Sequence, residues 1–340
     1  MIDLLVVGGG PAGLATAIHA ARAGLQVTVV EQRRGPIDKA CGEGLMPHAV
    51  RRLRALGPLP QGRPFDGITY LDDRRSVSAA FADGPGLGVR RTALHAALLT
   101  HAADAGVTFV QQRAGAVAQD EAAVTVNGLR ARYLVAADGL LSPIRAQLGL
   151  TLPPARPRRW GIKRHVSVAP WSDRVEVYWS PDPAVGEAYV TPLSDDCVGV
   201  AMLSSRQAPF DEHLSAFAPL RARLAGRPHA PDRAAGPLRQ RVRARASGRV
   251  LLVGDAAGYV DALTGEGVGL AFAAAEWAVT CVVADRPGDY DAGWRRMSRR
   301  YRWLTVGLLR AATSPLRSLI VPAAGHLPSG FAGAVHLLAD

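Results

Sequence analysis

Cysteine is scarce in this chain, which has only Cys41, Cys197 and Cys281 among its 340 residues. An odd number of widely separated cysteines excludes a disulfide framework and offers no metal-ligand spacing, so we expect no metal site. A charged leader with a cleavage site is also lacking, because the apolar run Ile2 to Val7 leads straight into a glycine-rich loop. These absences predict a reduced, cytoplasmic protein.

Acidic residues are outnumbered, with 29 Asp and Glu against 40 Lys and Arg and a formal net charge of +11. The basic residues are scattered and form no module interleaved with aromatic side chains, so we expect no nucleic-acid partner. Residues 239–245 place Arg at every second position, which predicts a strand with one solvated basic face. The Arg-rich stretch 294–303 is either a solvated face or a surface that rests on an anionic membrane.

Long uncharged runs are rare, and the one at residues 318–339 is interrupted by Pro322, Pro328 and several glycines. Its length would suffice to span a bilayer, but these residues argue against a spanning helix. We expect instead a helical C-terminal segment over residues 291–340. This segment covers an apolar substrate channel, docks at a membrane edge, or packs as ordinary core.

A dinucleotide-binding pattern opens the chain. Gly8, Gly10 and Gly13 follow the predicted strand 2–7 and enter a predicted helix, and a second predicted strand then ends at Glu31. The first glycine permits a tight turn, the second lets the backbone approach a pyrophosphate, and the third lets the helix pack close to the sheet. The carboxylate suits hydrogen bonding to an unmodified ribose, which favours FAD or NAD over NADP at this site.

Two further glycine-containing turns follow apolar runs. Asp138 and Gly139 follow the run 133–136, and Gly254 and Asp255 belong to the turn after the run that begins at Val250. A carboxylate at the end of a strand can accept a hydrogen bond from a ribitol hydroxyl. A glycine-rich loop over residues 264–269, which enters a predicted helix, can direct N–H groups at the edge of an electron-rich ring.

Together these three signals resemble the FAD-dependent p-hydroxybenzoate hydroxylase superfamily. Residues 39–45 and 264–267 are similar to loops of its geranylgeranyl reductase-like branch. The resemblance implies a tightly bound, non-covalent FAD. The residues that it assigns to the cofactor are Gly8, Gly10, Ala12, Gly13, Glu31, Gln32, Arg91, Asp138, Gly139, Gly254, Asp255, Gly265, Gly267 and Val268.

The fold implied is α/β, with a Rossmann-type FAD-binding domain, an antiparallel β-sheet substrate domain and the helical C-terminal segment. We expect a discontinuous FAD-binding domain over 1–62, 86–155 and 246–290, and a substrate domain over 63–85 and 156–245. Strand-like alternation predicts that the substrate domain lays a sheet over the flavin. Because no second glycine fingerprint is present, NADPH or NADH is expected to bind transiently on the same face.

Four residues are candidates for catalysis: Cys41, Glu43, His165 and Tyr178. The resemblance places the first two beside the flavin ring, where Cys41 either packs or forms a pocket wall, and Glu43 either holds a loop or relays a proton. Glu266, which also lies between two glycines, is likewise suspected of a functional role. His165 and Tyr178 lie on predicted strands and either deprotonate a phenol or are structural. Strand register decides which of them faces the pocket.

The leading hypothesis is an FAD-dependent oxidoreductase that uses NADPH or NADH. Its reduced flavin would react with oxygen and hydroxylate an aromatic or lipid-like phenolic metabolite of secondary metabolism. One alternative is a reductase that saturates C=C bonds of a prenyl chain, and another is a flavin-binding protein without turnover. The expected partners are a small hydrophobic substrate and oxygen, with a peripheral membrane contact as an option and the oligomeric state undetermined.

Overall fold

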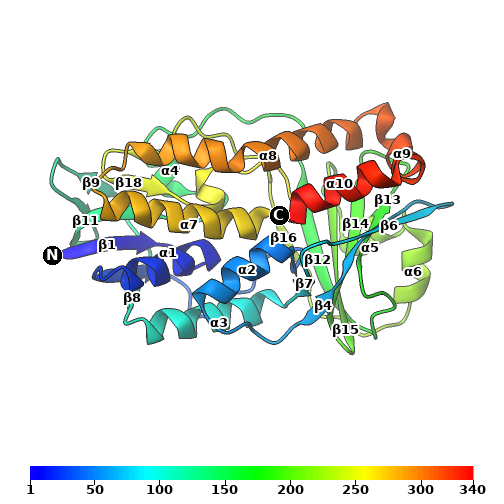
Figure 1. The fold of residues 1–340 in the computed structure, drawn as a ribbon, viewed down its shortest axis with the longest axis horizontal. Helices are drawn as coiled ribbons and strands as arrows, with labels where there is room; N and C mark the ends of the chain where they lie inside the picture. The colour runs from blue at the N-terminus through cyan, green and yellow to red at the C-terminus, as the bar shows by residue number, and fades with distance from the viewer. Residues whose placement is uncertain (340) are drawn as a thin grey trace.

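Two large sheets lie side by side along the long axis of the molecule in the computed structural model, which describes residues 1–339 (Figure 1). This arrangement confirms the α/β fold class. The first sheet has eight strands in the order β17-β18-β11-β1-β2-β8, with β10 and β9 attached to β11. Its strands are β1 (Ile2–Val7), β2 (Val27–Glu31), β8 (Thr108–Gln111), β9 (Val117–Gln119), β10 (Val124–Val126), β11 (Leu129–Ala136), β17 (Ala246–Ser247) and β18 (Val250–Leu252).

The five central strands of this sheet, from β18 to β8, pair in parallel. Four of them, β18, β11, β1 and β2, are Val- and Leu-rich and largely buried, as expected of a parallel sheet covered by helices, whereas β8 is mostly exposed. Helix α1 (Pro11–Arg22) packs against α3 (Arg91–Asp104) and α7 (Gly267–Val283), so these three helices form one layer. The helices around this sheet are α1 (Pro11–Arg22), α2 (Pro47–Leu56), α3 (Arg91–Asp104), α4 (Pro143–Gln147), η1 (Gly254–Ala257) and α7 (Gly267–Val283).

The second sheet has seven strands in the order β16-β12-β15-β14-β13-β5-β6. All neighbours pair antiparallel except β13 and β5, which are parallel, so the expected antiparallel sheet contains one parallel pair. Helices α5 (Phe210–Leu214) and α6 (Ala218–Leu224) pack in an apolar cluster with this sheet. The strands are β5 (Gly67–Leu71), β6 (Ser76–Ala80), β12 (Trp160–Ser167), β13 (Val175–Trp179), β14 (Glu187–Ser194), β15 (Cys197–Ser204) and β16 (Arg233–Ala235).

A small third sheet is formed by β3 (Gly44–Leu45), β7 (Gly86–Gly88) and β4 (Arg63–Phe65). The two strands within residues 67–81, β5 and β6, join the large antiparallel sheet. The domain boundaries given above stay a prediction.

Residues 289–339 are mostly helical. They form α8 (Asp289–Ala312), η2 (Pro315–Leu319), α9 (Ile320–His326) and α10 (Pro328–Ala339). Figure 1 shows α8 along the upper edge of the molecule, above both sheets, and α9 and α10 folded back over the second sheet, where they contact β6. None of the helices within residues 1–339 combines the length and hydropathy needed to cross a bilayer.

The prediction for residues 239–245 was wrong. These residues form no regular strand in the described structure and make only single bridges, from Gln240 to Tyr259 and from Val242 to Thr151. Nor is the basic face uniformly solvated, because Arg245 is buried, pairs with Asp291 and lies over the ring of Trp294. The alternation of arginines in the sequence could not reveal the acceptor of Arg245. That acceptor, Asp291 of α8, lies 46 residues further along the chain.

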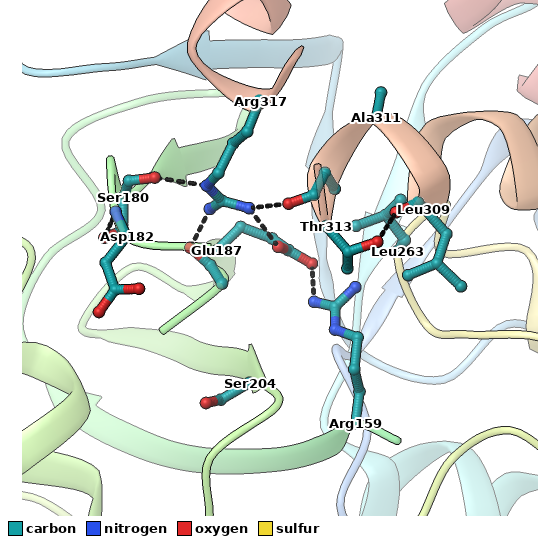
Figure 2. A network of polar contacts seen from close by, with 12 residues as sticks. Arg159, Ser180, Asp182, Glu187, Ser204, Leu263, Leu309, Ala311, Thr313 and Arg317 are labelled. Atoms are coloured by element: carbon teal, nitrogen blue, oxygen red, sulfur yellow. Dashed lines mark hydrogen bonds and ion pairs between the residues drawn. The ribbon is translucent and has the colours of Figure 1, made fainter. Parts of the chain in front are cut away.

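Arg317 anchors the C-terminal segment in a buried network (Figure 2). Its guanidinium donates to the backbone carbonyl groups of Ser180, Gly186 and Ala312, and it lies 3.7 Å from the carboxylate of Glu187. Glu187 also pairs with Arg159, which in turn lies 3.3 Å from Asp261. One network therefore joins η2, strand β14 and the loop before α7.

We predict that Arg317→Ala lowers the free energy of unfolding by about 3–5 kcal/mol, because it strips the buried Glu187 of one cation and leaves three carbonyl groups without a donor. Urea-induced unfolding measures the loss. Arg310→Ala is the matched control: its side chain is exposed in α8 and should change stability by less than about 0.5 kcal/mol. Equal effects of the two substitutions would contradict the anchoring role.

Candidate functional site

A cavity of about 450 Å³ lies between the two large sheets. Its walls come from the carboxyl ends of β1, β2, β11 and β18, from the loop 39–44, and from strands of the second sheet. The carboxyl ends of parallel strands are the usual place for a ligand in an open α/β sheet. All fourteen residues predicted to bind the cofactor lie along this cavity except Gly13, which lies one turn into α1.

The glycine loop has the close packing that its spacing predicted. Gly8 has φ +106°, and a Cβ there would lie 2.3 Å from the carbonyl oxygen of Ala137. A Cβ on Gly13 would lie 1.9 Å from the carbonyl oxygen of Gly8. At Gly10 a Cβ would be in ordinary contact with Arg91 Nη2, at 3.8 Å, and α1 begins there without a side-chain cap or an acidic residue in its first turn. The backbone N–H groups in the first turn of α1 therefore face the cavity, where they are available to bind an anion.

Glu31 lies next to this glycine loop. Its carboxylate accepts hydrogen bonds from the backbone N–H groups of Gly9 and Arg33, both at 2.9 Å. Burial opposes ionisation of Glu31, but these hydrogen bonds and the Arg33 side chain outweigh it and hold its pKa below the ordinary value. An ionised acceptor therefore stands beside the glycine loop, next to Gln32.

Two buried polar atoms at the cavity have no hydrogen-bond partner among the described residues: Asp138 Oδ1 and Arg91 Nε. Burial raises the pKa of Asp138 above its ordinary value. Asp255 is partly exposed, with Lys39 Nζ at 3.8 Å from its carboxylate. Orphaned atoms of this kind fit a large polar ligand that supplies both hydrogen-bond donors and acceptors.

The loop before α7 brings Gly265, Gly267 and Val268 to the cavity. Glu266, at its centre, is nine-tenths buried, and its Oε1 has no partner within the described chain. Burial raises the pKa of Glu266 to about 8, so this carboxyl group is largely protonated at neutral pH. It is the kind of buried, unpaired acid that is uncommon outside functional sites.

Glu43 is the most heavily bonded carboxylate at the cavity. Oε1 accepts from the Arg91 backbone N–H and from Lys163 Nζ, both at 2.7 Å, and Oε2 lies 2.5 Å from His165 Nε2. Burial would raise the pKa of Glu43, but contacts with His165 and Lys163 outweigh burial and hold the pKa below its ordinary value. Glu43 also has φ +60°, a left-handed conformation that costs a non-glycine residue about 1–3 kcal/mol.

The four candidate catalytic residues do not all lie at the cavity. Cys41 and Glu43 line the cavity, and Cys41 Sγ lies 3.4 Å from the Glu43 backbone N–H. His165 contacts Glu43 but lies outside the cavity lining. Tyr178 lies on the other face of the second sheet, in the apolar cluster with α5 and α6, and its hydroxyl donates to Glu176 at 2.6 Å. The structure does not bring Tyr178 to the cavity.

The sequence singled out neither Tyr70 nor Lys163, although both line the cavity. Tyr70 packs edge-on against Trp179, and its hydroxyl has no hydrogen-bond partner among residues 1–339. Lys163 is buried between Glu43 and Asp38, with 2.7 and 3.2 Å separations. One signal was present in the sequence: Lys39 and Lys163 are the only two lysines of an Arg-rich chain, and both line this cavity.

The sequence of the chain is similar to those of known proteins. A family profile described as FAD binding domain matches residues 1–280. Menaquinone reductase of Mycolicibacterium smegmatis is 31% identical over 337 residues, which cover 86% of this chain and 79% of the relative. Digeranylgeranylglycerophospholipid reductase 1 of Methanopyrus kandleri is 29% identical over 300 residues, covering 79% and 77%. A 3-(3-hydroxy-phenyl)propionate/3-hydroxycinnamic acid hydroxylase of Mycobacterium avium is 28% identical over 391 residues, covering 96% and 65%.

We predict that Glu266 makes the stability of the protein fall as the pH rises from about 5 to about 8. The folded protein keeps this proton up to about pH 8, whereas the unfolded chain releases it near the ordinary value of 4.5, so folding takes up a proton between these limits. The slope is at most about 1.4 kcal/mol per pH unit. Glu266→Gln should match the wild type at pH 5 and exceed its unfolding free energy at pH 8. Parallel curves from pH 5 to 9 would contradict the assignment.

Proposed function

The chain belongs to the FAD binding domain family of FAD-dependent oxidoreductases and monooxygenases, and we propose that it hydroxylates a neutral, lipid-like phenolic metabolite with NADPH or NADH as reductant. The matched relatives named above are enzymes, which leaves no support for the hypothesis of a flavin carrier without turnover. The observation that carries the proposal is the largely apolar wall, with no unpaired charge among the described residues, that the second sheet turns toward the cavity.

The residues around the cavity fit FAD. Gly10, Ala12 and the start of α1 would receive the pyrophosphate, and Glu31 and Gln32 would lie at the adenosine ribose. Arg91, Asp138 and Gly139 would meet the middle of the cofactor, where two buried atoms lack partners among the described residues. Gly254, Asp255, Gly265, Gly267 and Val268 would hold the ribitol and the ring edge.

Bound FAD supplies the redox chemistry: it accepts a hydride and activates oxygen. The protein has to position the ring, exclude water and bind the substrate. Glu43 serves the first task, since its three donors tie the loop 39–44 to α3 and β12 at the edge of the cavity. We assign no separate domain to the nicotinamide, which would reach the flavin through the same cavity.

Substrate selection follows from the wall of the second sheet. The residues that it contributes are apolar or neutral, among them Ile68, Val175, Val177 and Leu203, and the single charged exception is Lys163. Glu43 and Asp38 neutralise Lys163. A carboxylate substrate would therefore find no unpaired cation on this wall in the described structure. A neutral, largely hydrocarbon substrate fits it better.

Hydroxyl groups are the polar feature of this wall. The Tyr189 hydroxyl donates to the Leu263 carbonyl at 3.1 Å, whereas the Tyr70 hydroxyl has no partner within residues 1–339. Burial raises the pKa of Tyr70 above its ordinary value, so it remains a donor at neutral pH. No histidine occurs among the described residues that line the cavity. The ring should therefore be electron-rich through its own oxygen substituents, since no histidine of the described chain lies beside it to deprotonate a phenol.

Alkene reduction is the second candidate, and a separate observation favours it. Cys41 lies in the cavity lining within the loop that resembles reductases, and two relatives are named reductases. Such a reaction would use the same apolar wall for a prenyl chain and would require a proton from the protein, for which Glu266 and Tyr70 are protonated groups at or near the cavity.

One experiment tests the reaction. We predict that long-chain alkyl resorcinols stimulate NADPH-dependent oxygen uptake by the FAD-loaded protein and give a product one oxygen heavier by mass spectrometry. Carboxylated phenols of equal ring chemistry are the matched control and should be poor substrates, because the wall offers them no free cation. A product two hydrogens heavier, formed from prenyl compounds without oxygen, would instead establish the reductase.

We further predict that Tyr70→Phe raises the KM for the phenolic substrate about tenfold, because it removes a hydrogen bond to the substrate oxygen that is worth about 1–1.5 kcal/mol. Tyr178→Phe is the control, since it deletes the same atom from the other face of the sheet. Steady-state kinetics with both variants checks this. Equal KM values for the two variants would contradict the placement of the substrate.

A further inference from the structure

Exposed large apolar side chains gather at the C-terminal end of the described structure. Elsewhere only four such side chains are exposed, and they are dispersed: Met1, Phe109, Leu141 and Val283. Within residues 303–337 there are five, with Trp303 exposed by 76% and Leu327 by 66%. These five are Trp303, Leu316, Leu319, Leu327 and Leu337. Their density in one segment calls for a covering partner.

Helix α8 presents part of this surface as a stripe. Its exposed positions include Arg296, Arg300, Trp303, Gly307 and Arg310, which follow one another at intervals of four and three residues and therefore share one face. The opposite face carries buried side chains such as Tyr301, Thr305 and Leu309, which contact the body of the protein. One large aromatic side chain thus stands between arginines on a helix that lies along the edge of the molecule (Figure 1).

The charge of this segment has a single sign. Residues 292–339 contain no Asp or Glu and seven Arg. Three of these arginines are engaged, Arg317 in the buried network, Arg295 with Asp291 and Arg302 over Trp294. The other four, Arg296, Arg299, Arg300 and Arg310, have no ion-pair partner among the described residues. A partner for this surface should therefore be anionic as well as apolar.

We infer that α8 and the turns that follow it dock on the surface of an anionic lipid bilayer. Tryptophan is favoured at the boundary between headgroups and acyl chains, and arginine buries its stem there while its guanidinium meets phosphate groups. Four exposed leucines would enter the acyl region from η2, from the turn between α9 and α10, and from α10, as in an amphipathic segment that lies in the interface. The two chemistries of the patch match the two layers of one leaflet.

The patch is joined to the cavity wall. Phe331 of α10 packs against Tyr70, with ring centroids 4.8 Å apart, and Tyr70 lines the cavity. The Arg317 network holds the same segment to β14 (Figure 2). A bilayer seated here would lie one helix away from the apolar wall, where a substrate with a long hydrocarbon tail has its source. The inference does not depend on which of the two reactions the enzyme performs.

Flotation with vesicles tests the inference on the FAD-loaded full chain. The protein should bind vesicles of phosphatidylcholine with phosphatidylglycerol, bind pure phosphatidylcholine far less, and be released by high salt. Arg299→Gln/Arg300→Gln should weaken binding about tenfold. Arg51→Gln/Arg54→Gln on α2, equally exposed, is the matched control and should bind as the wild type does.

The apolar contribution has its own variant, Trp303→Ser/Leu316→Ser/Leu319→Ser, with Phe109→Ser/Leu141→Ser as the control. The first should lose vesicle binding while it keeps flavin absorbance and turnover of a short-chain, soluble substrate. Binding that no C-terminal variant changes would overturn the inference, as would absence of binding to anionic vesicles. Self-association that the same variants abolish, without vesicle binding, would overturn it too and would assign the patch to a second copy of the chain.

Discussion

The cluster of charges around Glu43 is the interaction on which the arrangement of the site depends. Its carboxylate lies where the loop 39–44, the start of α3 and strand β12 meet, and it takes donors from the last two. A buried carboxylate that lost these donors would cost several kcal/mol, and a non-glycine residue would not hold φ +60° without compensation. The second sheet is thereby held to the nucleotide-binding half at the place where the ring of a flavin would lie.

Much of the cofactor side was predictable because its constraints are local in sequence. A tight turn at Gly8 and the contact between Gly13 and Gly8 involve neighbours within a few residues, so the spacing alone reports them. Apolar runs that end in Asp138 and Asp255 report the parallel strands in the same way. The carboxyl ends of these strands meet at one edge, which makes the shared cavity a consequence of topology.

The substrate side was less predictable because it depends on register and on distant partners. Tyr70, Tyr178 and Tyr189 look alike in sequence, yet two line the cavity and the third lies under α5 and α6. A shift of one residue in strand register would move such a tyrosine from one face of the sheet to the other. Arg245 similarly alternates with neighbours like a solvated residue, and only the fold shows Asp291 and Trp294 beside it. For His165 the sequence left a catalytic and a structural role open, and the fold places it against Glu43, outside the cavity lining.

The contact between Phe331 and Tyr70 has a consequence for how such an enzyme diversifies. The final helix contacts Tyr70 of the cavity wall, whereas the residues that fit FAD all lie before residue 270. Mutations in the two regions therefore act under separate selection: one set has to preserve a fixed cofactor, while the other is free to reshape the room for a ligand. A lineage could alter α10, and through it the position of Tyr70, and still inherit the residues that fit FAD unchanged.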